Sequence, residues 1–233
     1  IDTVNPTVTI TSPINDNSYN ASDLPSISGS ASDVGSGLNR IEVQITDTTA
    51  IPDRVILAWS AADFDSATGA WVLNRSAFNT LLISGQTYKV EARAIDNAEG
   101  TSTPVPYISF TYDTTLPDAP VITTNGGSDF VTNQASVTLS GTNVSGIAQI
   151  LVNGAPISGF AAGNRSWTTT ADLPAASNTF DVTAKDAAGN ESLADTITIS
   201  KDTTLPTFGL VLDPIKTAYR AGDVITFTLT FNE

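Results

Sequence analysis

Short stretches in which apolar and polar residues alternate make up most of this chain, and clusters of Gly, Pro, Asn and Asp separate them. An alternation with a period of two is typical of half-buried β-strands, and no stretch of useful length has the 3.6-residue period of a helix. The segment from Ser76 to Leu82 comes nearest to a helix, and we expect it to be a crossover between strands. The predicted strands span residues 6–11, 25–31, 39–47, 54–60, 70–75, 86–95 and 105–112, then 119–123, 135–141, 147–152, 156–160, 166–171, 178–185 and 194–201, and finally 207–211 and 222–231.

The number and spacing of these strands predict an all-β fold of immunoglobulin-like sandwiches. About seven short strands in roughly 100 residues is the strand count of such a sandwich. The dipeptide Asn153-Gly154 stands between two apolar runs and predicts a tight hairpin, because both residues tolerate a positive φ. The chain has no Cys, so its cores must rest on the alternating apolar positions rather than on a disulfide.

Internal repeats divide the chain into three units. The sequence Asp-Thr-Thr-Leu-Pro at residues 113–117 recurs letter for letter at 202–206, and a looser copy occupies residues 2–6. Repetition at this period is typical of tandem domains joined by similar linkers. We therefore expect one β-sandwich in residues 1–112, a second in residues 113–201, and the N-terminal strands of a third, incomplete sandwich in residues 202–233.

A second repeated phrase precedes each later linker, and together the two phrases resemble a known family. The phrase is Ala-x-Asp-x-Ala, which occurs at residues 94–98 and again at 184–188, where Gly189 and Asn190 follow it. With the Asp-Thr-Thr linkers and the Ser-Gly-Ser-Ala-Ser-Asp run that begins at residue 28, the chain resembles the tandem bacterial immunoglobulin-like repeats of large secreted adhesins and surface stalk proteins. The first unit departs from the family pattern, since Glu99-Gly100 stands where the second unit has Gly-Asn.

Composition excludes several kinds of chemistry. The 233 residues contain no Cys and no His, and 24 acidic residues against 10 basic ones give a formal net charge of −14. Thiol nucleophiles, His-dependent catalysis and Cys or His metal ligands are therefore excluded, and nucleic acid is not an expected partner of so acidic a chain. No apolar run approaches the roughly 20 residues of a membrane span. Because the sequence has neither a signal peptide nor an initial Met, we expect a segment of a longer chain.

The resemblance gives the acidic residues a candidate role. In an immunoglobulin sandwich, the loops between strands B and C and between strands F and G lie at the pole where the chain enters, so a linker Asp approaches the Asp residues of those loops. Three carboxylates with nearby carbonyl groups suit Ca²⁺, which takes six to eight oxygen ligands. The expected ligands are Asp2, Asp33 and Asp96 in the first unit, Asp113, Asp186 and Asn190 with Asn143 and Ser145 in the second, and Asp202 with Asn232 and Glu233 in the third.

A simpler interpretation of these acidic residues stays open. Aspartate is a common turn residue because its carboxylate accepts hydrogen bonds from nearby backbone N–H groups. The second unit has Asn143 where the first has Asp33, so its metal site should be the weaker one. The run from Asp16 to Asn20 in the first unit could approach the junction with the second unit from the other side.

Aromatic residues suggest a competing function. Trp59 and Trp71 flank a predicted hairpin with Asp63 and Asp65 near its tip, and a pair of cross-strand Trp residues could stack on a sugar. The alternative is that at least one of them lies in the core, as large aromatic residues commonly do. Two carboxylates two residues apart on a turn do not face each other across a cleft, so we expect no catalytic pair here.

The sequence therefore predicts a non-enzymatic extender segment of an extracellular bacterial cell-surface adhesin of the biofilm type, rigidified by Ca²⁺ at its linkers. Its expected partners are neighbouring immunoglobulin-like domains of the same longer chain, with a surface glycan or protein receptor bound through other regions. Two alternatives stay open: an accessory carbohydrate-binding module of a secreted enzyme, and a strand-exchanged subunit of a surface filament. The incomplete third unit is compatible with a chain boundary or with strand exchange.

Overall fold

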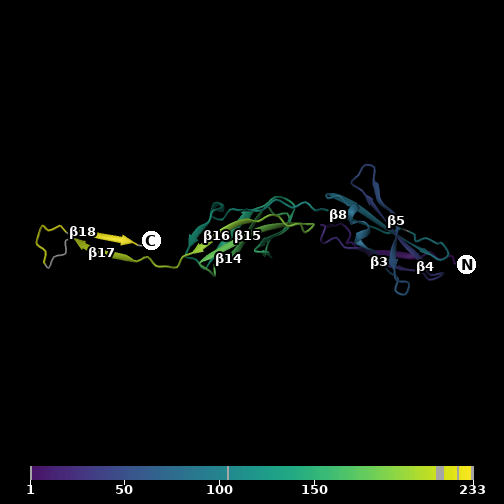
Figure 1. The fold of residues 1–233 in the computed structure, drawn as a ribbon, viewed down its shortest axis with the longest axis horizontal. Coiled ribbons are helices and arrows are strands. Elements are labelled where there is room, and N and C mark those ends of the chain that lie inside the picture. Colours follow the sequence, from purple (N-terminus) through teal and green to yellow (C-terminus); the bar gives the residue numbers. More distant parts are fainter. Residues whose placement is uncertain (1, 104, 214–217, 225, 232–233) are drawn as a thin grey trace.

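A computed structural model describes residues 2–103, 105–213, 218–224 and 226–231. Two β-sandwiches and a separate two-stranded hairpin follow one another along the long axis of the molecule, with the N-terminus at one end (Figure 1). The predicted all-β class of immunoglobulin-like sandwiches is confirmed. We refer to residues 7–112 as the first sandwich and to residues 121–201 as the second.

The first sandwich consists of eight strands. In order of hydrogen bonding they are β1-β3-β6-β5-β4-β7-β8-β2. The long strand β5 belongs to both layers, because its first part pairs with β4 and its last residues, Asp63 and Phe64, pair with β6. The bounds are β1 Thr7–Ser12, β2 Asn17–Tyr19, β3 Ile27–Ser32, β4 Leu38–Asp47, β5 Arg54–Phe64, β6 Ala70–Leu73, β7 Gln86–Asp96 and β8 Tyr107–Tyr112.

The second sandwich packs a sheet of five strands against a sheet of three. Their orders are β10-β16-β15-β12-β13 and β14-β11-β9. As predicted, Asn153 and Gly154 have positive φ values of 51° and 78° and form the turn between β12 and β13. The bounds are β9 Val121–Ile122, β10 Phe130–Thr132, β11 Ser136–Thr142, β12 Ile147–Val152, β13 Ala155–Pro156, β14 Ser166–Asp172, β15 Ser177–Asp186 and β16 Asp195–Lys201.

Each sandwich has its own hydrophobic core, made by the residues that the alternation assigns to one face. On β4, Ile41, Val43 and Ile45 are fully buried while the residues between them are partly exposed. Val90, Ala92 and Ala94 repeat this pattern on β7, and Val182 and Ala184 do so on β15. Two separate clusters of buried side chains result, so each sandwich buries its own apolar surface.

The predicted strands agree with the observed ones except at a few places. The segment near Ser76 forms two short 3₁₀ turns, η1 (Arg75–Ala77) and η2 (Asn79–Leu81), and is a crossover as expected. The prediction missed the short strands β2 and β10, each of which joins a neighbouring strand in parallel. It also placed a strand at residues 156–160, whereas β13 ends at Pro156. Strands of two or three residues are too short for an alternation to be visible.

The last two strands, β17 (Phe208–Asp213) and β18 (Thr226–Phe231), pair only with each other among the described residues. They are antiparallel, with Phe208 opposite Phe231 and Asp213 opposite Thr226. Side chains on the hairpin such as Phe208 and Leu229 are 66% and 51% exposed. The strand predicted at 222–231 is observed from Thr226 onward. Its residue Ile225 lies outside the described residues.

Candidate metal site at the pole of the first sandwich

The three linkers begin with the same local structure. In each, one carboxylate oxygen of the leading Asp accepts a hydrogen bond from the backbone N–H two residues further on, at distances of 2.9, 2.9 and 2.8 Å for Asp2, Asp113 and Asp202. This turn is the structural role that the simpler interpretation predicted for these residues. It explains the repeated Asp without any metal ion, so a metal site must be argued from further geometry.

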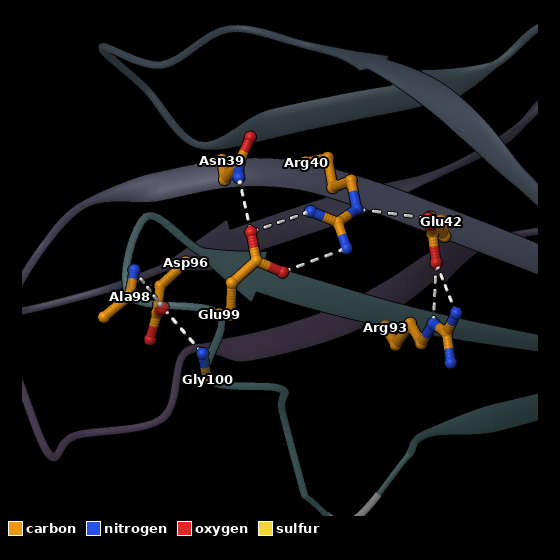
Figure 2. Close-up of polar contacts among 8 residues, drawn as sticks. All are labelled: Asn39, Arg40, Glu42, Arg93, Asp96, Ala98, Glu99 and Gly100. Carbon is orange, nitrogen blue, oxygen red and sulfur yellow. Dashed lines mark hydrogen bonds and ion pairs between the residues drawn. The ribbon is translucent and has the colours of Figure 1, made fainter.

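The loops that follow β7 and β15, which are the F–G loops of the two sandwiches, also share one structure. Oδ1 of Asp96, at the end of β7, accepts hydrogen bonds from the N–H groups of Ala98 and Gly100, both at 2.8 Å (Figure 2). Oδ1 of Asp186, at the end of β15, accepts from the residues at the same spacing, Ala188 and Asn190. In both loops this arrangement leaves Oδ2 outside the turn, available for another contact.

Among the described residues, only the Asp of the first F–G loop has two further carboxylates close to it. Asp33 follows β3, and its Oδ2 accepts hydrogen bonds from the N–H groups of Gly35 and Gly37 at 3.1 and 2.7 Å. Oδ2 of Asp2 accepts one from the N–H of Ser36 at 2.6 Å, which holds the linker against the same loop. One oxygen each of Asp2, Asp33 and Asp96 lies within 4.8 Å of the other two, and among the described residues no other set of three carboxylates comes this close.

Two glycines make room for this cluster. A Cβ atom at Gly35 would collide with the carboxylate of Asp2. A Cβ atom at Gly100 would lie 2.5 Å from Oδ2 of Asp96, closer than side-chain atoms come to each other. The absence of side chains at these two positions lets the carboxylates of Asp2 and Asp96 lie directly against the loops.

The residues of the cluster fit a hard divalent cation. Asp96 is 1% exposed, and Oδ1 of Asp33 is buried without a hydrogen-bond partner. Three carboxylates at this separation repel one another, and a buried oxygen without a partner costs free energy. A calcium ion would relieve both costs, since it takes carboxylate oxygens at 2.3–2.6 Å in flexible geometry.

The equivalent pole of the second sandwich is organised differently. The carboxylate of Asp113 points to the first sandwich, where Oδ1 accepts a hydrogen bond from Oγ of Ser84 at 3.1 Å. Asn190 brings its side-chain amide to Oδ2 of Asp186 and to the backbone carbonyl of Asp113, both at 2.9 Å. Asn143 stands in the place of Asp33 after the B strand, and its Oδ1 is likewise buried without a partner. The structure thus groups Asp186 and Asn190 with the backbone, but not with the carboxylate, of Asp113.

Among the contacts of the described residues, the side chain of Asp202 shows only the linker turn. Its side chain accepts from the N–H of Thr204, and its own N–H donates to the carbonyl of Thr132 at 2.9 Å. The two residues expected beside it, Asn232 and Glu233, lie outside the described residues.

Backbone hydrogen bonds set the acidity of the linker carboxyls. The pKa of Asp2 is held below its ordinary value by the N–H of Val4 first and then by that of Ser36. The N–H of Thr115 lowers the pKa of Asp113, and the N–H of Thr204 lowers that of Asp202. A hydrogen bond to the charged carboxylate favours its ionised form.

We expect the three linker turns to resist acid. The pKa values of these three carboxyls are lower in the folded chain than the ordinary aspartate value of 3.8. The turns therefore stabilise the fold to their full extent above pH 3.8, and this stabilisation is lost as the pH falls through the lower folded pKa values. NMR titration of the side-chain carboxyl carbons should therefore give midpoints below 3.8 for Asp2, Asp113 and Asp202. Midpoints at or above that value would contradict the hydrogen-bonded turns.

A series of ion pairs crosses the outer face of the first sandwich near the carboxylate cluster, and the sequence pattern did not predict it. Arg40 contacts Glu99 at 3.3 Å and Glu42 at 3.2 Å, and Glu42 in turn is paired with Arg93 (Figure 2). Burial raises the pKa of Glu42, but Arg93 and then Arg40 outweigh it, so the net shift is downward. The register that places Glu42 opposite Arg93 could have been inferred only after β4 and β7 were paired.

Trp59 and Trp71 do not form the pair that could have stacked on a sugar. Trp71 on β6 is 3% exposed and belongs to the core, which is the alternative that the sequence left open. Trp59 on β5 is partly exposed, and the guanidinium carbon of Arg93 lies 4.3 Å from the centre of its ring. A ring in this cation–π contact has one face already occupied.

Comparison with known proteins supports the fold and part of the family resemblance. Residues 6–72 match the family described as the bacterial Ig domain, which confirms the resemblance to bacterial immunoglobulin-like repeats over most of the first sandwich. The fibronectin(III)-like modules of Clostridium thermocellum CbhA are similar in structure, with a TM-score of 0.51, 17% identity and coverage of 84% of this chain and 94% of theirs. At this identity the similarity establishes the fold alone.

Two further similar structures, one from an adhesin and one from a biofilm associated protein, have TM-scores below 0.5. The sialic acid binding region of the Streptococcus sanguinis SK1 adhesin has a TM-score of 0.30 at 13% identity, with 87% of this chain and 78% of that one covered. The BSP domain of a biofilm associated protein has a TM-score of 0.27 at 16% identity, and the match covers 86% of this chain and 30% of that one.

No curated protein sequence is similar enough to this chain to count as a match. Among the described residues, no helix has the length and apolar character needed to span a membrane.

Proposed function

We propose that this chain is a non-enzymatic extender segment of a bacterial cell-surface adhesin, and that a calcium ion bound by Asp2, Asp33 and Asp96 stiffens its first linker. The observation that carries the proposal is the cluster of three carboxylates at the pole of the first sandwich, in which Oδ1 of Asp33 is buried and lacks a hydrogen-bond partner. The extracellular location follows from the same proposal and is supported by the bacterial Ig domain match.

Each ligand comes from a different part of the chain, which gives the ion a mechanical role. Asp2 belongs to the linker, Asp33 to the B–C loop and Asp96 to the F–G loop. An ion held by all three would fix the direction of the linker relative to the sandwich. The two loops are already joined, because the side-chain amide of Asn97 donates to the carbonyls of Ser36 and Gly37. The linker is joined to the B–C loop through Asp2 and Ser36, and the ion would add a connection from the linker to the F–G loop.

The arrangement of the sandwiches supports reach rather than catalysis. They follow one another in a row, and short linkers containing Pro, whose φ is fixed, separate them (Figure 1). Bacterial Ig domains and fibronectin(III)-like folds are typically non-catalytic. The expected neighbours of this segment are further immunoglobulin-like domains of the same longer chain.

The hairpin of β17 and β18 supports a third sandwich in residues 202–233. In the first sandwich β1 pairs antiparallel with β3, and in the second β9 pairs antiparallel with β11. The pairing of β17 with β18 repeats this pattern after a linker of the same sequence. Two strands alone cannot bury an apolar face, so the hairpin needs further strands to form a core.

Calcium removal tests the proposal. A ligand present at 100 times its dissociation constant stabilises the folded state by about 2.7 kcal/mol, which corresponds to roughly 10 °C or more in the melting temperature of a domain of this size. We expect EDTA to lower the melting temperature of the first sandwich by about this amount, and added Ca²⁺ to restore it. Small-angle scattering in EDTA and in Ca²⁺ should show that neither sandwich becomes more compact in one condition than in the other.

The control for this experiment is magnesium. Mg²⁺ prefers a near-ideal octahedron at 2.0–2.1 Å and keeps several waters, so it should restore the melting temperature less than Ca²⁺ at equal concentration. An unchanged melting temperature after complete removal of divalent ions would refute the calcium proposal while leaving the fold as described.

A further inference from the structure

The junction between the two sandwiches contains a buried side-chain amide, whereas the first pole has a cluster of three carboxylates. Asn190 is 7% exposed and lies in the F–G loop of the second sandwich. One N–H of its amide reaches Oδ2 of Asp186, and the amide nitrogen also donates to the backbone carbonyl of the linker residue Asp113, both at 2.9 Å. Asn190 thus connects the loop carboxylate to the linker, which is the task that we assign to the ion at the first pole.

The linker carboxylate is correspondingly turned away from this pole. Oδ1 of Asp113 accepts hydrogen bonds from Oγ of Ser84 and from the N–H of Thr115, at 3.1 and 2.9 Å. The backbone N–H of Asp113 donates to the carbonyl of Tyr19 at 3.0 Å. Asp113 is therefore bonded to the first sandwich through its carboxylate and N–H, and to the second through its carbonyl.

Direct contacts between loops reinforce the junction. The N–H of Asn20 in the first sandwich donates to the carbonyl of Ala188 in the second at 3.2 Å. Gly189 has a φ of +89°, and a Cβ atom there would lie 3.0 Å from a carboxylate oxygen of Asp23. The loop that follows β2 thus approaches the F–G loop of the second sandwich closely. This is the side of the junction that the sequence analysis expected the run from Asp16 to Asn20 to reach.

We propose that Asn190 is the residue that fixes the second sandwich on the first, and that its amide makes this junction independent of divalent cations. The amide nitrogen donates hydrogen bonds to a carboxylate and to a carbonyl oxygen, and it carries no formal charge. With the carboxylate of Asp113 held by Ser84, the junction keeps the carboxylates of Asp186 and Asp23, and among the described residues neither belongs to a close group of three such as the first pole has. A cation at Oδ2 of Asp186 would have to compete with the amide nitrogen for this oxygen.

One position in the sequence distinguishes the two kinds of pole. Four residues after the loop Asp, the second sandwich has Asn190 and the first has Gly100. At Gly100 even a Cβ atom would crowd Oδ2 of Asp96, so the first pole has no room for such an amide. The inference does not depend on calcium at the first pole, because it concerns contacts between the two sandwiches only.

The absence of native Cys allows a direct distance measurement across the junction. Spin labels can be attached to the full chain carrying Thr80→Cys in the first sandwich and Thr170→Cys in the second, both exposed positions. We expect pulsed dipolar spectroscopy to give the same narrow distance distribution in Ca²⁺ and in EDTA. The Asn190→Ala variant should give a markedly broader distribution in both conditions. Asn190→Gly, which copies the residue of the first pole, should do the same if Asn190→Ala does not fold.

A matched control separates loss of the junction from loss of stability. Asn178 is also a buried Asn of the second sandwich, but its amide bonds only to Ala175 and Ile199 of the same sandwich. Asn178→Ala should lower the melting temperature and keep the narrow distribution. A narrow distribution in folded Asn190→Ala and Asn190→Gly would overturn the proposal. So would a wild-type distribution that broadens in EDTA, whether or not the first pole binds calcium.

Discussion

Replacing Trp167 by Ala is expected to lower the free energy of unfolding of the second sandwich by about 3–5 kcal/mol, the usual cost of truncating a large buried aromatic residue. Trp167 on β14 is 4% exposed and belongs to the second core. Total stabilities of single domains are about 5–15 kcal/mol, so this loss would remove a large share of it.

The reason for the large effect is the way the indole packs on the neighbouring strand. Trp167 lies opposite Gly141 of β11, and a Cβ atom at Gly141 would collide with the ring. The first sandwich repeats this pair, with Trp71 opposite Gly29 and a Cβ atom at Gly29 placed 2.8 Å from Cζ2 of the ring. In each pair the indole fills the space that the glycine leaves.

Denaturant unfolding followed by circular dichroism provides the measurement. Trp167→Ala should shift the transition of the second sandwich alone, and Trp71→Ala that of the first. Trp59→Ala is the control, because Trp59 is partly exposed and its contact with Arg93 is worth only about 0.5–1 kcal/mol. A loss below about 1 kcal/mol in Trp167→Ala would contradict the assignment of Trp167 to the core.

Replacing Asp33 by Asn is expected to weaken calcium binding by about 100-fold or more, since loss of even an outer contact of a metal site costs 10–100-fold. The substitution removes one of three clustered charges and keeps the size of the side chain. The carbonyl oxygen of the amide can still accept the hydrogen bonds that Oδ2 of Asp33 receives from Gly35 and Gly37. The loop should therefore keep its structure.

Competition against a calcium-sensitive dye measures this affinity. Asp53→Asn is the control, since Asp53 is an exposed carboxylate of the first sandwich outside the cluster, and it should leave the affinity unchanged. The melting temperature of Asp33→Asn in EDTA should lie within a few degrees of the wild-type value. Equal calcium affinity in the two variants would exclude Asp33 as a ligand.

The sequence predicted the fold well because a period of two is a local signal. Strands such as β4 and β7 carry several alternations, and their observed bounds lie within one residue of the predicted ones. β2 and β10 were missed because three residues are too few to show a period, and both are positioned by pairing with distant strands. The turn at Asn153-Gly154 was found because its conformation depends on these two residues themselves.

The site could be predicted only in part. The grouping of Asp2, Asp33 and Asp96 followed from the loop order of an immunoglobulin-like sandwich, and the structure brings these three residues together. The same reasoning treated Asn190 as a source of oxygen, whereas its contacts with Asp186 and Asp113 are made by its nitrogen. The direction of an amide depends on its acceptors, and these became visible only when the linker and the loop were placed together. The linker repeat itself is explained by the turn that each Asp forms, so repetition alone does not indicate a metal.

The most direct test of the central proposal is native mass spectrometry of the full chain after removal and re-addition of calcium. The carboxylate cluster predicts one retained calcium ion per chain, which is lost in a variant carrying Asp2→Asn, Asp33→Asn and Asp96→Asn together. The amide at the second pole predicts that no ion is retained there. Absence of any calcium adduct in the wild-type chain, or an adduct that persists in the triple variant, would contradict the assignment of a calcium site to the pole of the first sandwich.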